Sequence, residues 1–188
     1  MPRIRPLEYA EATPDVRAAH DEVVREQGRI TNMKRTLLHS LPAFHALMEW
    51  YTLRDAVQPF LGERLTTLFS QAISAENDCL VCSTYFRRIL IESGEDPEQF
   101  ALDEREGLVV EFGRCLAKPF GRVPDALFVR LAAAFSDEQI VALTAFGALM
   151  VATNVFNNAL NVDLDGYLEP YRKGSQAPIP SGPAEGAA

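Results

Sequence analysis

Two helices with a short break between them are predicted by residues 65–90, which read LTTLFSQAISAENDCLVCSTYFRRIL. The apolar residues before the break recur at the spacing of one buried helix face: Leu65, Leu68, Phe69, Ala72 and Ile73. Asn77-Asp78 interrupts this pattern. Asp78 is a residue type that caps helices, so a new helix is expected from Cys79 to about Ser93.

The helical pattern continues through the rest of the chain. Further helices are expected over about residues 14–28, 42–57, 103–117, 124–135 and 136–160. Pro59 is expected to end the helix over 42–57, because proline lacks the amide hydrogen that a helix interior needs. No long alternation of apolar and polar residues predicts a strand. The sequence therefore predicts an all-α fold, a single-domain helical bundle.

The last of these helices is unusually apolar. From Ile140 to Val162 there is no charged residue, which is enough to cross a membrane. Its second half, however, carries four asparagines, Asn154, Asn157, Asn158 and Asn161, and amides are costly in hydrocarbon. In a soluble protein, a helix that is apolar all round is buried on every side. We therefore expect no membrane contact, and expect another subunit of a homo-oligomer to cover part of this helix.

Composition excludes some classes of function. The chain has 188 residues, with 18 Lys and Arg against 26 Asp and Glu, a net charge of −8, so no nucleic-acid partner is expected. One domain over residues 1–172 and a disordered Pro/Gly/Ala tail over 173–188 are predicted. Three cysteines are too few for a disulfide scaffold, and the first residues lack a secretory pattern. A cytoplasmic location is expected.

Two of the three cysteines, Cys79 and Cys82, have the spacing of one helical turn at a predicted helix N-terminus. Free amide hydrogens and the helix dipole favour a thiolate there, and a second thiol one turn away can resolve an oxidised first one. Two inert core cysteines are the alternative reading. A structural zinc ion is disfavoured because no second ligand pair accompanies them. Cys115 is expected to be a small buried residue.

The segment Ala72-Ile-Ser-Ala-Glu-Asn-Asp-Cys-Leu-Val-Cys82 resembles the core motif of the carboxymuconolactone decarboxylase and alkyl hydroperoxidase D superfamily. Residues 135–143 and 154–163 resemble its closing helix and exit, and residues 4–44 resemble the opening of longer members. The resemblance covers roughly residues 4–170. It implies an all-α homo-oligomer that works without a cofactor or a metal.

Site residues follow from the same resemblance. It implies that Cys82 is the peroxide-attacking thiol and Cys79 the resolving one. The redox members also use a Glu and a His as proton relay, and Thr67 and Phe86 stand at those positions here. Glu76 is the candidate substitute, because it lies on the apolar stripe three residues before Cys79, where burial would raise its pKa. If the helix frays at Asn77, Glu76 instead points into water.

Other candidates lie outside the motif. His39 and His45 belong to a segment that could pack near it, and Trp50 and Tyr51 could line a pocket. Tyr85 is expected to point away from the cysteines.

Three functions remain open on the sequence. The first is an alkylhydroperoxidase-like oxidoreductase with an antioxidant role, which reduces a small-molecule peroxide or exchanges disulfides, with a thiol reductant protein as partner. The second is a cofactorless decarboxylase-like enzyme on a small carboxylic acid or lactone, for which Arg87 or Arg88 supplies a cation. The third is a non-catalytic helical oligomer that has lost the proton relay.

Overall fold

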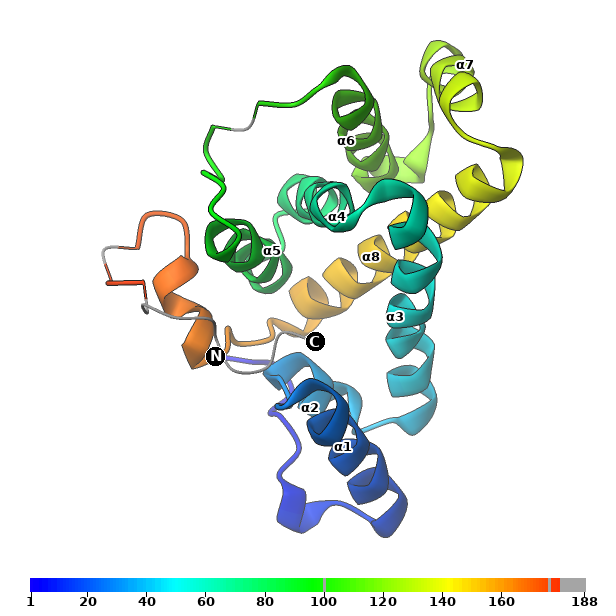
Figure 1. The fold of residues 1–188 in the computed structure, drawn as a ribbon. Coiled ribbons are helices and arrows are strands. Elements are labelled where there is room, and N and C mark those ends of the chain that lie inside the picture. Colours follow the sequence, from blue (N-terminus) through cyan, green and yellow to red (C-terminus); the bar gives the residue numbers. More distant parts are fainter. Residues whose placement is uncertain (100, 176, 180–188) are drawn as a thin grey trace.

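The computed structural model describes residues 1–99, 101–175 and 177–179, and helices are the only regular elements in these ranges (Figure 1). The α-helices are α1 (Pro14–Gln27), α2 (Asn32–Leu37), α3 (Leu41–Leu61), α4 (Glu63–Glu76), α5 (Leu80–Glu92), α6 (Glu104–Ala117), α7 (Asp125–Ala134) and α8 (Asp137–Leu160). Short 3₁₀ helices are η1 (Tyr9–Glu11), η2 (Pro119–Gly121) and η3 (Gly166–Tyr171). The all-α prediction is confirmed.

Helix α4 lies at the centre of the core, in contact with α3, α5, α6 and α8 (Figure 1). Its Phe69 stacks on Phe112 of α6 and Phe146 of α8, with ring centroids 6.3 and 5.9 Å apart. Gly113 and Gly147 let these rings approach, since a Cβ atom at either glycine would lie 2.9 Å from a carbon of Phe69. A smaller apolar cluster joins α1 and α2 to the start of α3.

The break between α4 and α5 fixes the position of the cysteine pair. Asp78 adopts a left-handed φ of 50°, and Cys79 rather than Asp78 is the residue that caps α5. The expected Asp78 cap is therefore wrong, because the chain turns at Asp78 itself. Amides of α8 hold this turn: Asn154 donates to the Asn77 side chain at 3.1 Å, and Asn158 to the Asn77 carbonyl at 2.9 Å.

Two further expectations about helices need correction. Helix α3 continues through Pro59 to Leu61: the proline deprives the Asp55 carbonyl of its amide donor, but the loss of this one bond does not end the helix. Helix α2 was not predicted, since six residues are too few for apolar periodicity to appear. The expected division into a domain over 1–172 and a tail over 173–188 stays a prediction, and residues 176 and 180–188 of that tail lie outside the described ones.

Helix α8 is buried on one side only. Phe146, Met150 and Asn154 lie in the core, whereas Val141 and Val155 are 68% and 58% exposed. One chain therefore leaves part of this helix uncovered, and its cover by another subunit stays a prediction. Of the described helices, α8 is the one long and apolar enough to cross a membrane, by length and composition alone. The predicted cytoplasmic location is not tested by this feature.

The outer face of α8 leads to a prediction about assembly. Its exposed apolar residues alternate in steps of four and three: Val141, Ala145, Ala148, Ala152, Val155 and Ala159. This is the spacing of a coiled-coil contact, so we expect a second copy to pack here. Ala148→Glu should then reduce the mass in multi-angle light scattering from a multiple of 20.8 kDa to 20.8 kDa. The exposed Ala18→Glu change on α1 is the control, and a parent protein of 20.8 kDa would contradict the prediction.

Candidate active site

The two cysteines meet at the N-terminus of α5. Cys79 caps the helix, and its Sγ accepts a hydrogen bond from the Cys82 backbone amide at 3.4 Å. Cys79 is fully buried and Cys82 is 5% exposed. The prediction that both thiols lie within one helical turn at a helix start is confirmed. Cys115, expected to be buried, is only partly so, and packs against the core from α6.

A hydrogen bond between the two thiols shifts their pKa values in opposite directions. The hydrogen bond from Cys82 is the largest effect on Cys79 and lowers the pKa of that thiol, although burial opposes it. The same hydrogen bond, together with burial, raises the pKa of Cys82. Asn157 of α8 donates from Nδ2 to Cys82 Sγ at 3.2 Å, which lowers the pKa of both thiols. The first proton therefore leaves from Cys79, and the remaining one lies on Cys82 and points at it.

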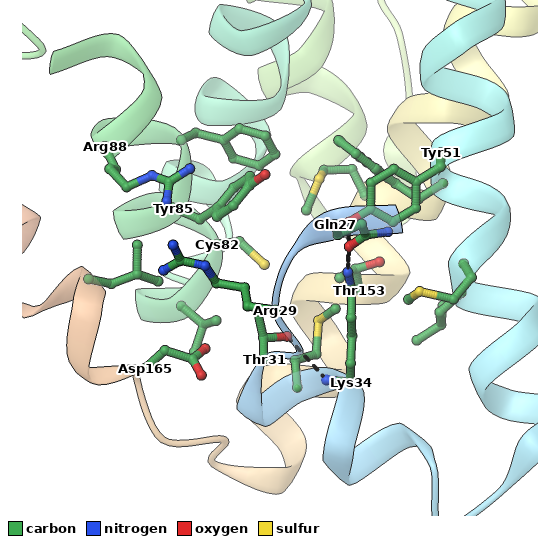
Figure 2. Close-up of a pocket in the computed structure, with 18 of the residues that line it drawn as sticks. Gln27, Arg29, Thr31, Lys34, Tyr51, Cys82, Tyr85, Arg88, Thr153 and Asp165 are labelled. Atoms are coloured by element: carbon green, nitrogen blue, oxygen red, sulfur yellow. Dashed lines mark hydrogen bonds between the residues drawn. The ribbon is translucent and has the colours of Figure 1, made fainter. Parts of the chain in front are cut away.

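A cavity of about 120 Å³ opens beside Cys82, between α3, α5, α8 and the segments around α2 and η3 (Figure 2). Cys82 lines it and Cys79 does not. Trp50, Tyr85 and Phe86 supply aromatic surface to the cavity. Any molecule in the cavity would therefore meet the sulfur of Cys82 first.

Among the charged residues that line this cavity, cations outnumber carboxylates. The cations are Arg29, Lys34, Arg54 and Arg88. Asp165 is the only carboxylate among the described residues that line it. In Figure 2, Cys82, Tyr85 and Arg88 lie on one side of the view, and Lys34, Gln27 and Tyr51 on the other.

Lys34 is the most unusual of these cations, because it is only 3% exposed. Helix α2 places it: Thr31 caps the helix by accepting from the Lys34 backbone amide. The ammonium donates to Tyr51 Oη at 3.0 Å and to Gln27 Oε1. No carboxylate of the described residues lies within 4 Å of it. Burial lowers the pKa of Lys34 to about 8.

The expected substitute for the proton relay does not lie at the site. Glu76 is exposed at the end of α4 and does not line the cavity, so the alternative in which it points into water is the correct one. Phe86 lines the cavity without a titratable group. Thr67 is buried and donates to the Glu63 carbonyl at 3.0 Å, so its hydroxyl is engaged within α4. The structure thus brings Cys79 and Cys82 together but leaves Glu76 apart.

The other candidates divide between the cavity and the surface. Trp50 and Tyr51 line the cavity, as expected, while His39 and His45 are exposed and lie outside it. Tyr85 also lines it, contrary to expectation, because residues three apart on a helix share a side and Tyr85 follows Cys82 by three. Of the two arginines proposed as cations, Arg88 lines the cavity. Arg87 instead pairs with Glu98.

Sequence reasoning missed two residues of this site. Lys34 lies in the short helix that was not predicted, so nothing indicated its burial. Asn157 did leave a signal, since four asparagines in an apolar helix need polar partners. One of those partners is the sulfur of Cys82. In the described part of the chain, no three His, Cys, Asp or Glu side chains gather as metal ligands would.

Comparisons with known proteins identify the fold. No family model and no curated protein matches the chain. Among solved structures, the debrominase Bmp8 has a TM-score of 0.73 at 17% identity, covering 89% of this chain and 95% of its own. A Cys-to-Ala variant of Bmp8, in complex with 2,3,4-tribromopyrrole, has a TM-score of 0.74 at 16% identity, covering 89% and 94%.

Two further solved structures are similar to this chain. A peroxidase-related protein from Silicibacter sp. TM1040 has a TM-score of 0.71 at 16% identity, covering 85% of this chain and 90% of its own. A protein of unknown function from Agrobacterium tumefaciens, proposed to be the antioxidant defence protein AhpD, has a TM-score of 0.56 at 22% identity, covering 68% and 93%. The chain therefore has the alkyl hydroperoxidase D-like fold that the cysteine motif implied.

Proposed function

We propose that this protein is a dithiol oxidoreductase in which Cys82 attacks a small electrophilic substrate in the cavity and Cys79 resolves the product as a disulfide. The observation that carries the proposal is the placement of the two sulfurs. Cys82 lines the cavity, and Cys79 lies behind it, fully buried and joined to it by a hydrogen bond. A non-catalytic role would fit better if both sulfurs were buried without an adjoining cavity.

The leading substrate class is a hydroperoxide. Cys82 Sγ attacks the terminal oxygen, the O–O bond breaks, and the Cys82 proton passes to the leaving alkoxide, which becomes an alcohol. Cys82 is then a sulfenic acid, and Cys79 keeps its own proton. Cys79 Sγ attacks the Cys82 sulfur, the S–O bond breaks, and the hydroxide leaves as water with the Cys79 proton. An external thiol reductant returns the disulfide to two thiols by exchange.

A halogenated ring is the second substrate class. The aromatic lining of the cavity favours it, and Bmp8, of the same fold, is a debrominase. In that reaction a carbon–bromine bond is replaced by a carbon–hydrogen bond, while two thiols become a disulfide and bromide and one proton are released. Both reactions oxidise the cysteine pair by two electrons, so the same sulfurs serve either substrate.

The decarboxylase-like alternative requires polar groups that converge beside the sulfurs. Lys34, Arg54 and Arg88 do line the same cavity as Cys82. That reaction leaves both thiols reduced, whereas the proposed one oxidises them. The redox state of the thiols after contact with substrate therefore separates the two.

Counting thiols tests the proposal. The parent has three cysteines and should lose two free thiols per chain on one equivalent of an organic hydroperoxide. Cys82→Ser should lose none or one, and Cys115→Ser is the control that should still lose two. Repeating the count with a brominated pyrrole, together with assay of free bromide, identifies the substrate class. If neither reagent removes thiols from the parent, the proposal is wrong.

A further inference from the structure

We infer that the cavity beside Cys82 is a binding site for a single-ring organic anion, whose ionised oxygen or nitrogen is held by the Lys34 ammonium. The inference deepens the proposed function, because it names the charge and size of the substrate that Cys82 attacks. Binding itself does not need the sulfur, so the two can be tested separately.

The residues that line the cavity indicate that the ligand carries a negative charge. Cationic side chains outnumber carboxylates around this cavity, although the whole chain carries a net charge of −8. Arg54 pairs with Asp55 at 2.8 Å and Arg88 with Glu92 at 3.6 Å. Lys34 has no such partner: Asp165 and Glu26 act on it only from beyond ion-pair distance. A buried ammonium without a counter-ion is costly, and an anionic ligand would neutralise it.

Two residues that line the cavity also carry buried hydrogen-bond donors without an acceptor at hydrogen-bond distance. Trp50 Nε1 is buried and finds no hydrogen-bond partner among the described residues, and Arg88 Nε has only Glu92, at 3.6 Å, beyond hydrogen-bond distance. Both residues line the cavity, and Arg88 as a whole is 4% exposed. Unpaired buried donors are rare in folded proteins, and those at ligand sites are commonly satisfied by the ligand. The ligand is therefore expected to bring an acceptor for these donors and a donor for Asp165 Oδ2, which is also buried without a partner in the cavity lining.

The volume and the lining of the cavity indicate the size and the apolar part of the ligand. A cavity of about 120 Å³ is close to the ~150 Å³ of an engineered apolar cavity that binds benzene, so one ring fits. Trp50, Tyr85 and Phe86 offer aromatic faces to such a ring. Aliphatic fatty-acid chains and fused rings would need more room. A phenolate, an azolate or a benzoate combines this size with one negative charge.

A nitrophenol tests the inference, because only its phenolate form is coloured. The Cys82→Ser variant is used, so that no thiol chemistry intervenes. At a pH below the pKa of the free nitrophenol, adding protein should generate the phenolate colour to saturation. Lys34→Met should weaken this binding about 10–100-fold, the loss expected for one charge-assisted hydrogen bond. Lys34→Arg, which keeps the charge, should recover most of it.

The controls separate charge from apolar affinity. Lys118→Met removes an exposed lysine outside the cavity and should bind nitrophenol as the parent variant does. Nitrobenzene, a neutral ring of similar size, should bind at least tenfold more weakly and should not respond to Lys34→Met. If both rings bind equally, or if neither binds, the inference is wrong. If the phenolate binds but thiol counts never change, the binding site stands and the proposed redox function fails.

Discussion

Cys79→Ser should slow the resolution of oxidised Cys82 about 1,000-fold or more, yet still allow one equivalent of peroxide to oxidise Cys82. The reason lies in the two steps of the proposed reaction. Cys82 lines the cavity and can meet the substrate without its neighbour, whereas resolution needs a second thiol. A thiol held one helical turn away acts at an effective concentration far above that of any thiol in solution. Without it, the resolution step itself requires an external thiol to reach the buried sulfur of Cys82.

Two variants make this assignment testable. Cys79→Ser should accumulate a sulfenic acid on Cys82, which dimedone traps and mass spectrometry locates. Cys82→Ser should form no adduct on Cys79 and should not turn over peroxide. The lower pKa of Cys79 alone would favour the opposite assignment, since thiolates are the attacking species. Cys79 is nevertheless not assigned as the attacking thiol, because it is fully buried and does not line the cavity. An adduct on Cys79 in the Cys82→Ser variant would show that the roles are reversed.

The sequence predicted the elements that have strong periodicity or clear caps. The apolar stripe of α4 is one such signal, and the capping box at the start of α8, formed by Ser136 and Gln139, is another; tertiary contacts override neither. The cysteine pair was predicted for the same reason, because its spacing and its place after a helix break are both local. Pro59 misled because the loss of one amide donor does not end a helix that packs against α4 and α8, and those contacts are not visible in the sequence.

The rest of the site depends on contacts between distant segments. Lys34 and Tyr51 meet across 17 positions, and Asn157 meets Cys82 across 75. Neither of these two pairs has a sequence spacing that indicates contact. Charge could not indicate the site either, because a buried lysine and an exposed one look alike in the sequence. The polar half of the cavity therefore became visible only once α2, α3 and α8 were placed around α5.

Lys34→Met should stabilise the protein by about 2 kcal/mol at pH 7. The pKa of Lys34 falls from 10.5 to about 8 on folding, because burial disfavours the ammonium. The unfolded chain therefore binds this proton more tightly than the folded one does. At pH 7 both states carry the proton, and a shift of this size corresponds to about 3 kcal/mol against folding. Met removes the charge, and Tyr51 Oη still donates to Gln27 Oε1 at 3.1 Å, so little is lost in exchange.

The pH dependence of the stability difference between the parent and Lys34→Met tests whether the buried ammonium causes it. As pH rises from about 8 toward 10.5, the folded parent loses the Lys34 proton before the unfolded chain does, and the parent becomes more stable relative to Lys34→Met. The difference between the two proteins should therefore shrink to about 1 kcal/mol or less at pH 10. Urea unfolding of both at pH 7 and pH 10 measures it. Lys118→Met, at an exposed lysine, should differ from the parent by less than about 0.5 kcal/mol at either pH. Equal stability of parent and Lys34→Met at pH 7 would mean that the buried ammonium is already neutralised. A stabilised variant that no longer binds the phenolate would instead show that the chain retains Lys34 for its ligand at the expense of stability.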